Sequence, residues 1–174
     1  MRVFGLAGWS GSGKTTLLTR LLPALIQRGV SVSTIKHAHH AFDVDQPGKD
    51  SYRHREAGAT EVMVSSQNRW ALMHELRGAA EASLEQLLRH MSPVDLVIVE
   101  GFKGAAVPKL EIYRAALEKP LLATEDSDIV AIASDLPVAG IGQLPRFALD
   151  DVGTIAGFII DHLGLAGQDR GAAQ

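Results

Sequence analysis

A glycine-rich segment near the start of the chain constrains the fold more than any other feature of the sequence. The residues Gly8-Trp9-Ser10-Gly11-Ser12-Gly13-Lys14-Thr15 match the P-loop pattern, in which two glycines separated by four residues precede Lys and Thr. An apolar run at 3–7 precedes the segment, and leucines at helical spacing follow it. The order of strand, glycine turn and helix predicts a loop whose backbone amides surround an anion.

Each residue type in this loop has a physical role. The glycines allow backbone conformations that other residues resist, so that successive N–H groups can point inward. Lys14 is expected to reach the β- and γ-phosphates of a nucleotide and to act in catalysis, and the Thr15 hydroxyl is expected to ligate Mg²⁺. Thr16 either touches the α-phosphate or caps the first helical turn. The predicted phosphate-binding residues are Gly11, Ser12, Gly13, Lys14, Thr15 and Thr16.

The rest of the chain alternates strand and helix patterns. Strands are expected at 30–35, 94–99, 109–113 and 129–133, and a hairpin at 61–65 and 69–76. One helix is expected to begin at about Lys14 and to be capped at Gly29, and others are expected at 50–57, 79–91 and 152–163. The first strand, the helix after the glycine loop and the next strand form a βαβ unit with parallel pairing. We therefore expect a three-layer α/β P-loop NTPase fold with a mainly parallel sheet and an antiparallel hairpin extension. One domain is expected over 1–164, followed by a flexible tail at 165–174.

Acidic residues beyond the loop are candidates for metal binding and catalysis. Glu100 follows four aliphatic residues, so its carboxylate is expected at the carboxyl edge of the sheet, where ligands bind in open α/β folds. It would hold a water on Mg²⁺ or polarise the attacking water, and the alternative is an exposed acid at a strand end. Asp43 and Asp45 are expected to reach Mg²⁺ directly or through water, Asp43 in a catalytic role and Asp45 as a metal ligand.

A histidine-rich segment follows the second strand. His37, His39 and His40 lie next to Lys36 and precede the two aspartates. Three interpretations remain open: an anion or second-ligand site beside the nucleotide, a transition-metal site, or a solvated polar loop.

Base recognition is the least constrained part of the prediction. Guanine presents the N1–H and N2–H₂ donors together, and a single carboxylate can accept both. The pair Ser134-Asp135 follows the strand at 129–133 immediately, and Asp135 is the candidate guanine reader, although an Asp that caps a turn before Leu136-Pro137 fits the same position.

Composition excludes some classes of function. Lys and Arg number 17 and Asp and Glu number 20, a net charge of −3, which does not suggest a nucleic-acid binder. Cysteine is absent, so disulfides, thiolate metal sites and cysteine nucleophiles are excluded. The apolar runs are far shorter than the ~20 residues that span a bilayer, so we expect a cytoplasmic protein without a membrane partner.

Several segments together resemble the molybdopterin-guanine dinucleotide biosynthesis protein B family, MobB. These are the glycine loop, Ile35-Lys36-His37-Ala38-His39-His40, the segment from Asp43 to Tyr52 with Pro47-Gly48-Lys49-Asp50, Gln67 to Leu72, Val99-Glu100-Gly101-Phe102-Lys103, and Ala131 to Asp135. The resemblance implies a GTP-binding accessory protein with weak GTPase activity, usually a homodimer. It also implies that the protein assists a MobA-type guanylyltransferase in molybdenum cofactor biosynthesis, with molybdopterin as a candidate ligand of the histidine segment. By position, the phosphate and Mg²⁺ roles fall on 11–16 and Glu100.

Two other functions remain open on the residues alone. A P-loop small-molecule kinase would pass the γ-phosphate to a bound metabolite. A metal-delivery adaptor would use the nucleotide as a switch and the histidines as ligands.

Overall fold

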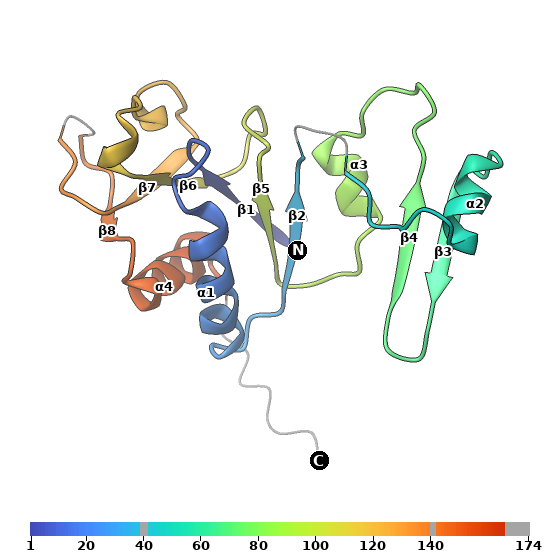
Figure 1. Ribbon diagram of the computed structural model, residues 1–174. Coiled ribbons are helices and arrows are strands. Elements are labelled where there is room, and N and C mark those ends of the chain that lie inside the picture. The colour runs from blue at the N-terminus through green and yellow to red at the C-terminus, as the bar shows by residue number, and fades with distance from the viewer. Residues whose placement is uncertain (39–41, 140–141, 166–174) are drawn as a thin grey trace, which may run out of the picture. The chain divides into compact units, whose positions relative to one another are not determined.

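The computed structural model describes residues 1–38, 42–139 and 142–165 (Figure 1). They form two compact units, one of residues 1–37 with the chain from Ser92 onward, the other of residues 38–91. A single domain over 1–164 therefore stays a prediction. No helix in the described parts of the chain combines the length and hydrophobicity needed to cross a bilayer.

The first unit contains a six-stranded sheet in the order β2-β5-β1-β6-β7-β8. All neighbouring strands in this sheet are parallel. The strands are β1 (Arg2–Ala7), β2 (Val32–Lys36), β5 (Leu96–Glu100), β6 (Lys109–Tyr113), β7 (Ile129–Ser134) and β8 (Arg146–Ala148). The predicted strands therefore form, and β8 is a short additional edge strand that the sequence pattern did not indicate.

One detail of the predicted βαβ unit is wrong, because β1 and β2 are parallel but not adjacent. Strand β5 lies between them and pairs with both. Every residue of β5 is buried, whereas β2 has alternating partial exposure. The aliphatic strand, apolar on both faces, thus takes the interior position, and the more polar β2 takes the edge.

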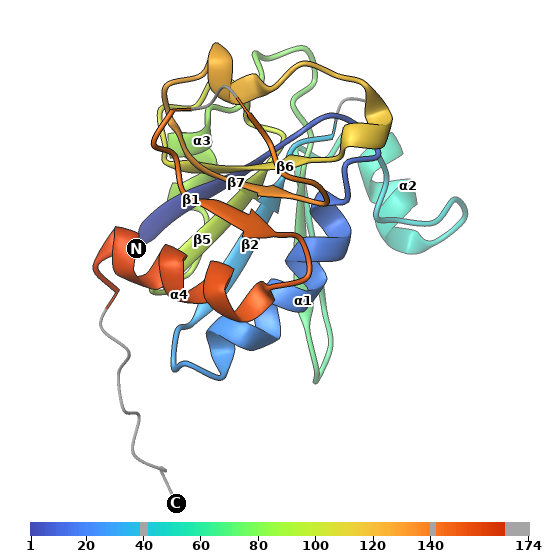
Figure 2. The same ribbon diagram turned by 90° about the vertical axis from the view of Figure 1, so that its left-hand side faces the viewer.

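Two helices cover one face of this sheet. Helix α1 (Lys14–Ile26) buries Leu17, Leu21 and Leu25, and helix α4 (Val152–Leu163) buries Ile155, Ala156 and Ile159. These side chains share one core cluster with alternate residues of β1, β5, β6 and β7. Figure 2 shows α1 and α4 on the same side of the sheet. The leucine spacing that predicted α1 is therefore the spacing of its buried face.

The opposite face of β7 packs against short turns. Ile132 alternates with the helix-facing Ala131 and Ala133, and it lies in a second cluster with Leu121 and Leu122. Two 3₁₀ helices lie in this region, η1 (Ala115–Leu117) and η2 (Leu122–Thr124). The buried Glu111 of β6 accepts hydrogen bonds from the N–H groups of Leu122 (2.8 Å) and Ala123 (2.9 Å) at the start of η2. Burial nevertheless raises the pKa of this carboxyl.

The second unit is built on an antiparallel hairpin of β3 (Glu61–Ser65) and β4 (Trp70–His74), together with α2 (Asp50–Glu56) and α3 (Leu84–Arg89). The predicted helix at 79–91 is shorter than expected. Ser83 caps α3 with a capping box in which its hydroxyl accepts from the Gln86 N–H and the Gln86 side chain accepts from the Ser83 N–H. This box starts the helix at Leu84.

The mainly parallel sheet, its helices and the antiparallel hairpin confirm the predicted α/β class.

Candidate functional site

The carboxyl ends of the central strands meet at one edge of the sheet. Cross-strand pairs place Glu100 beside Leu6 of β1 and Lys36 of β2, and Ser134 beside Tyr113 of β6. The loops that follow β1, β5, β6 and β7 therefore open at the same edge, which is where open α/β sheets bind ligands.

The loop between β1 and α1 has the conformation that its glycines allow. Gly8, Gly11 and Gly13 all have positive φ, at 146°, 82° and 99°. At Gly8 a Cβ atom would lie 2.5 Å from the carbonyl oxygen of Ile112, so the loop is packed directly on β6. Gly13 is the N-cap of α1. The Gly residues of the motif are thus required by the backbone.

Lys14 is turned back onto the loop. Its Nζ donates to the carbonyl oxygens of Gly8 (2.8 Å) and Trp9 (3.0 Å). Partial burial lowers the pKa of Lys14, while the charge of Glu100 opposes this shift and the charges of Lys103 and Lys36 add to it. The ammonium therefore lies in a cationic, half-buried setting that favours an anion.

Additional cations surround Trp9 in this loop. The ammonium groups of Lys103 and Lys119 lie 5.4 and 5.8 Å from the centre of its ring, within cation–π range. The indole N–H donates to the carbonyl oxygen of Pro120 at 2.8 Å. Neither lysine was singled out from the sequence as a part of the site.

Ser12, one of the predicted phosphate-binding residues, is buried, with 1% of its surface exposed. The hydroxyl oxygen has no hydrogen-bond partner among the described residues, and it would lie 2.7 Å from a Cβ added at Gly8. The hydroxyl therefore lies under the loop, and the main-chain N–H of Ser12 donates to the carbonyl oxygen of Trp9 at 3.1 Å. The phosphate contact of Ser12 stays a prediction.

The residues at this edge fit a magnesium ion. Thr15 lies in the first turn of α1 and is exposed, and Glu100 ends β5 with 9% of its surface exposed. A hydroxyl and a carboxylate are hard oxygen ligands, and Mg²⁺ in nucleotide sites needs only one or two such groups besides phosphates and waters. The lack of a cluster of three or more His, Asp or Glu side chains in the described residues is compatible with that donor set.

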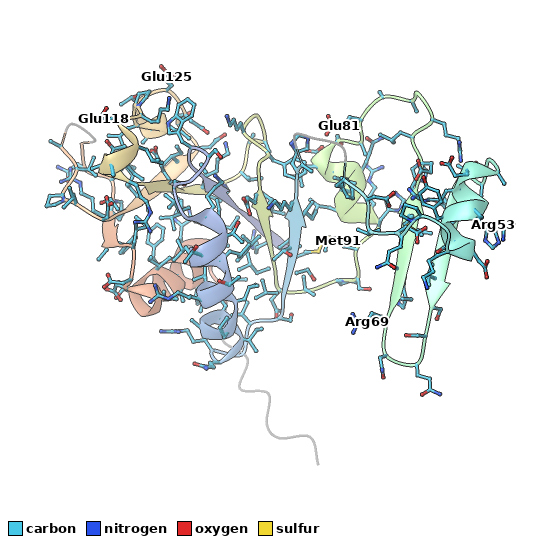
Figure 3. The ribbon with its side chains drawn as sticks, in the orientation of Figure 1. Arg53, Arg69, Glu81, Met91, Glu118 and Glu125 are labelled. Atoms are coloured by element: carbon cyan, nitrogen blue, oxygen red, sulfur yellow. The ribbon has the colours of Figure 1, made fainter. Side chains whose placement is uncertain are left out.

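The two other predicted acids lie in the second unit and are engaged there by Arg55. Asp43 accepts a hydrogen bond from Arg55 at 2.7 Å, and Asp45 lies 3.5 Å from the same guanidinium and accepts from Ser51 at 2.9 Å. The Arg55 hydrogen bond holds the pKa of Asp43 below its usual range. Arg53 of the same helix points away from the hairpin (Figure 3). The Mg²⁺ and catalytic roles of Asp43 and Asp45 stay predictions.

The histidine segment is only partly described. His37 follows β2, and its ring packs on Phe102 with centroids 5.4 Å apart. His39 and His40 lie outside the described residues, so the three interpretations of this segment remain predictions.

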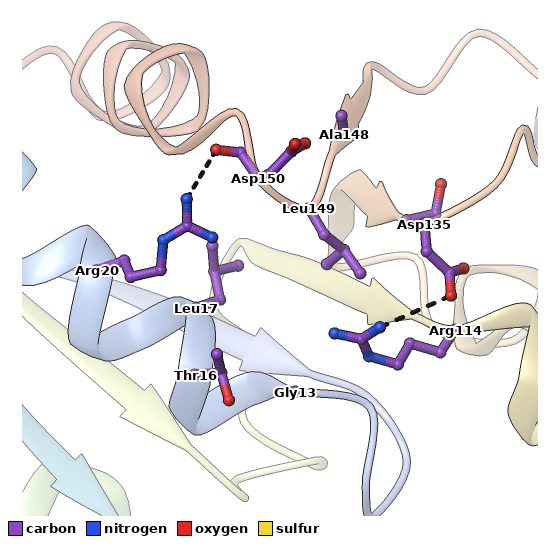
Figure 4. A pocket seen from close by; sticks show the side chains of 10 residues that line it. Gly13, Thr16, Leu17, Arg20, Arg114, Asp135, Ala148, Leu149 and Asp150 are labelled. Atoms are coloured by element: carbon purple, nitrogen blue, oxygen red, sulfur yellow. Dashed lines mark hydrogen bonds and ion pairs between the residues drawn. The ribbon is translucent and has the colours of Figure 1, made fainter.

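A pocket of about 330 Å³ adjoins the helix end of the loop (Figure 4). Its lining comes from the start of α1 and from the segments at the ends of β6, β7 and β8: Gly13, Thr16, Leu17, Arg20, Arg114, Ser134, Asp135, Ala148, Leu149 and Asp150. Asp135, the predicted guanine reader, therefore lies in the same pocket as two residues of the predicted phosphate site, Gly13 and Thr16.

Arg114 is a pocket residue that sequence reasoning missed. Its Nε donates to the carbonyl oxygen of Ser12 at 3.0 Å, and its Nη1 lies 3.8 Å from Oδ2 of Asp135. Oδ1 of Asp135 accepts from the N–H of Ala115 at 3.1 Å. The signal that identified Glu100 and Asp135, a polar residue directly after a buried strand, also applies to Arg114 after β6.

A parallel sheet whose first strand leads through a glycine loop into a helix at the carboxyl edge defines a P-loop NTPase α/β fold. The chain belongs, within that class, to the molybdopterin guanine dinucleotide synthesis protein B family, MobB, whose family model matches residues 3–135.

Two curated relatives carry the name molybdopterin-guanine dinucleotide biosynthesis adapter protein. The protein of Escherichia coli (strain K12) is 43% identical over 160 residues, covering 90% of each chain. That of Haemophilus influenzae (strain ATCC 51907 / DSM 11121 / KW20 / Rd) is 42% identical over 165 residues, covering 92% of this chain and 89% of the relative. A crystal structure of molybdopterin-guanine biosynthesis protein B aligns with a TM-score of 0.73 at 30% identity, covering 92% of this chain and 99% of that one. The predicted family is confirmed.

Proposed function

We propose that this chain is a GTP-binding adapter with slow, Mg²⁺-dependent GTPase activity, which assists a MobA-type guanylyltransferase in making molybdopterin guanine dinucleotide. Membership of the MobB family and the names of the curated relatives support the adapter role. The observation that carries nucleotide binding is the loop itself, in which three glycines with positive φ and the inward-turned Lys14 surround the start of α1.

Phosphate binding follows from the groups of this loop. Backbone N–H groups at the helix start and the positive end of the α1 dipole favour the triphosphate. Lys14 would exchange its two carbonyl acceptors for phosphate oxygens and gain a charge-assisted hydrogen bond. Thr15 and Glu100 would hold Mg²⁺, which supplies charge neutralisation on the phosphate oxygens when it is bound.

Slow turnover is expected because the arginine beside the loop lies at the nucleoside end of the site. Arg114 is engaged by Ser12 and Asp135 in the pocket that adjoins Thr16. A guanidinium that stabilises the transition state would have to lie at the γ-phosphate, and it can contribute on the order of 10³ or more to the rate. A partner protein could supply such a group.

Replacement of the loop lysine tests nucleotide binding. Lys14→Ala should weaken the binding of GTP and of tripolyphosphate by well over tenfold, because both ligands lose the same charge-assisted contact. Lys49→Ala is the matched control, since Lys49 lies in the second unit, at the N-cap of α2, and its side chain makes no capping bond there. Calorimetric titration with and without Mg²⁺ provides the affinities, and circular dichroism checks the fold. Unchanged affinity in a folded Lys14→Ala protein would contradict nucleotide binding at this loop.

We further propose that the protein is a homodimer joined through the β3–β4 hairpin. Met63 pairs with Leu72 and Ser65 pairs with Trp70 on one face of the hairpin, and Met63 and Trp70 are each 61% exposed. Val62, on the other face, is buried. A two-stranded hairpin with an exposed apolar face is marginally stable alone, so a second copy that covers the face would stabilise both.

Sedimentation analysis tests the dimer. Met63→Lys should convert the dimer to monomer, because it would bury an unpaired charge in the interface. Leu136→Lys introduces the same charge at an exposed apolar residue outside the hairpin and should leave the dimer intact. A wild-type monomer at tens of micromolar, or a Met63→Lys protein that stays dimeric, would overturn this interface.

A further inference from the structure

We propose that Arg114 is a base-reading residue that acts together with Asp135 and selects guanine over adenine. This inference rests on the proposed function, because it concerns the same nucleotide. It adds a residue and a recognition mechanism that follow from the pocket beside the loop.

The position of the pocket indicates which part of a nucleotide would occupy it. Gly13 and Thr16 belong both to the pocket lining and to the predicted phosphate site. A triphosphate in the loop would therefore place its nucleoside next to them, between the start of α1 and the segments that follow β7 and β8. Leu17, Ala148 and Leu149 provide apolar surface for a flat ring, and a volume of about 330 Å³ lies at the small end of ligand pockets.

The contacts of Arg114 place its guanidinium against the loop. In addition to the hydrogen bond to Ser12 and the ion pair with Asp135, Nε and Nη2 would each lie 3.4 Å from a Cβ added at Gly13. The guanidinium of Arg114 therefore lies against the backbone of Gly13, the N-cap residue of α1. Guanidinium has five N–H donors, and the hydrogen bond found within the described residues uses one of them, at Nε. Donors remain for a ligand in the pocket.

Asp135 likewise retains accepting capacity. Its Oδ1 accepts from Ala115, while Oδ2 lies 3.8 Å from Arg114, beyond hydrogen-bond distance. An ionised carboxylate accepts about four hydrogen bonds, so two or more further donors can be accommodated.

Arg114 and Asp135 thus present a donor group next to an acceptor group. The edge of guanine carries the O6 and N7 acceptors next to the N1–H and N2–H₂ donors, and Arg is a common partner of O6 and N7. Arg114 would donate to O6 and N7, and Asp135 would accept from N1–H and N2–H₂. Adenine reverses this order, because it has a donor amino group at position 6 and an acceptor at N1. The pair therefore favours guanine and opposes adenine at two adjacent atoms.

The test compares four ligands that separate phosphate binding from base reading. GTP, ATP, inosine triphosphate and tripolyphosphate are titrated calorimetrically against the full chain and its variants. Arg114→Lys keeps the positive charge and can still reach the Ser12 carbonyl, but it loses the planar fork. Arg28→Lys is the matched control, since this guanidinium also joins two segments, through the carbonyl oxygens of Ala24 and Gly153, at the other end of α1.

The proposal predicts a specific pattern. Wild-type protein should bind GTP at least about tenfold more tightly than ATP, the scale of one good base contact. Arg114→Lys should lose about tenfold in affinity for GTP and for inosine triphosphate alike, since both carry the O6 acceptor that adenine lacks, with ATP and tripolyphosphate within about twofold. Asp135→Asn should weaken GTP more than inosine triphosphate, which lacks the N2 amino group.

Other results separate the possible failures. If Lys14→Ala does not weaken tripolyphosphate binding, the proposed function itself fails. If Lys14→Ala does weaken it while Arg114→Lys leaves the GTP-to-ATP ratio of wild type, the base-reading role fails alone. A loss of tripolyphosphate affinity in Arg114→Lys would show that Arg114 only shapes the loop, and would also overturn the role. Equal wild-type affinities for GTP and ATP would do the same.

Discussion

Gly8→Ala tests the geometry of the loop in depth. The φ of 146° at Gly8 is a conformation that only glycine adopts readily, and imposing it on alanine costs about 1–3 kcal/mol. The new Cβ would also lie 2.5 Å from the Ile112 carbonyl oxygen and 2.7 Å from the Ser12 hydroxyl oxygen. Overpacking of this kind costs about 1–3 kcal/mol more.

The summed loss is about 2–6 kcal/mol, a large part of the 5–15 kcal/mol that stabilises an ordinary domain. For a chain of this size the midpoint of thermal unfolding should fall by roughly 5–20 °C. GTP affinity should fall as well, because a shifted Gly8 distorts the loop whose backbone N–H groups would surround the phosphates. Differential scanning calorimetry and calorimetric titration measure the two effects.

Gly157→Ala is the internal control for the same change. Gly157 lies within α4, and a Cβ there would meet nothing within 4 Å. Alanine in a helix interior is favoured over glycine by about 0.5–1 kcal/mol, so this variant should be slightly more stable than wild type. A Gly8→Ala protein with wild-type stability and wild-type GTP affinity would refute the packing of the loop on β6.

Three further predictions concern stability. Leu21→Ala removes a fully buried side chain from the α1 face and should cost about 2–5 kcal/mol in chemical denaturation, whereas Ile26→Ala, at an exposed residue of the same helix, should cost far less. Arg55→Ala should speed amide hydrogen exchange in the hairpin unit but not in β1 and β5, because Asp43 and Glu75 lose their ion pairs with Arg55. Equal acceleration of exchange in both units would argue against a local role. The hydrogen bonds from Thr154 lower the pKa of Asp151, so the carboxylate charge stabilises the fold above about pH 4 and this stabilisation is lost as the pH falls further. The difference in free energy of unfolding between wild type and Asp151→Asn, measured in urea titrations, should therefore shrink from pH 7 to pH 3.

Local patterns in the sequence were sufficient for the elements and for the loop. The leucine spacing of α1, the aliphatic run of β5 and the glycine motif each predict a local structure from residues that are close together in the sequence. The family followed from short motifs for the same reason. The sequence pattern placed the start of α3 too early. The information that sets this start is also local, since the capping residue Ser83 is adjacent to it in the sequence.

Contacts between distant segments decided the rest. No local pattern states that β5 lies between β1 and β2, because strand order depends on which strand can be buried on both faces. Arg114 and Asp135 are twenty-one residues apart and meet because β6 and β7 are neighbours in register. The catalytic role of Asp43 stays a prediction, and its hydrogen bond to Arg55, which no sequence pattern indicates, depends on α2 returning to it. Side-chain pairing across the chain depends on how the backbone folds back, and residue type and spacing carry little of that information.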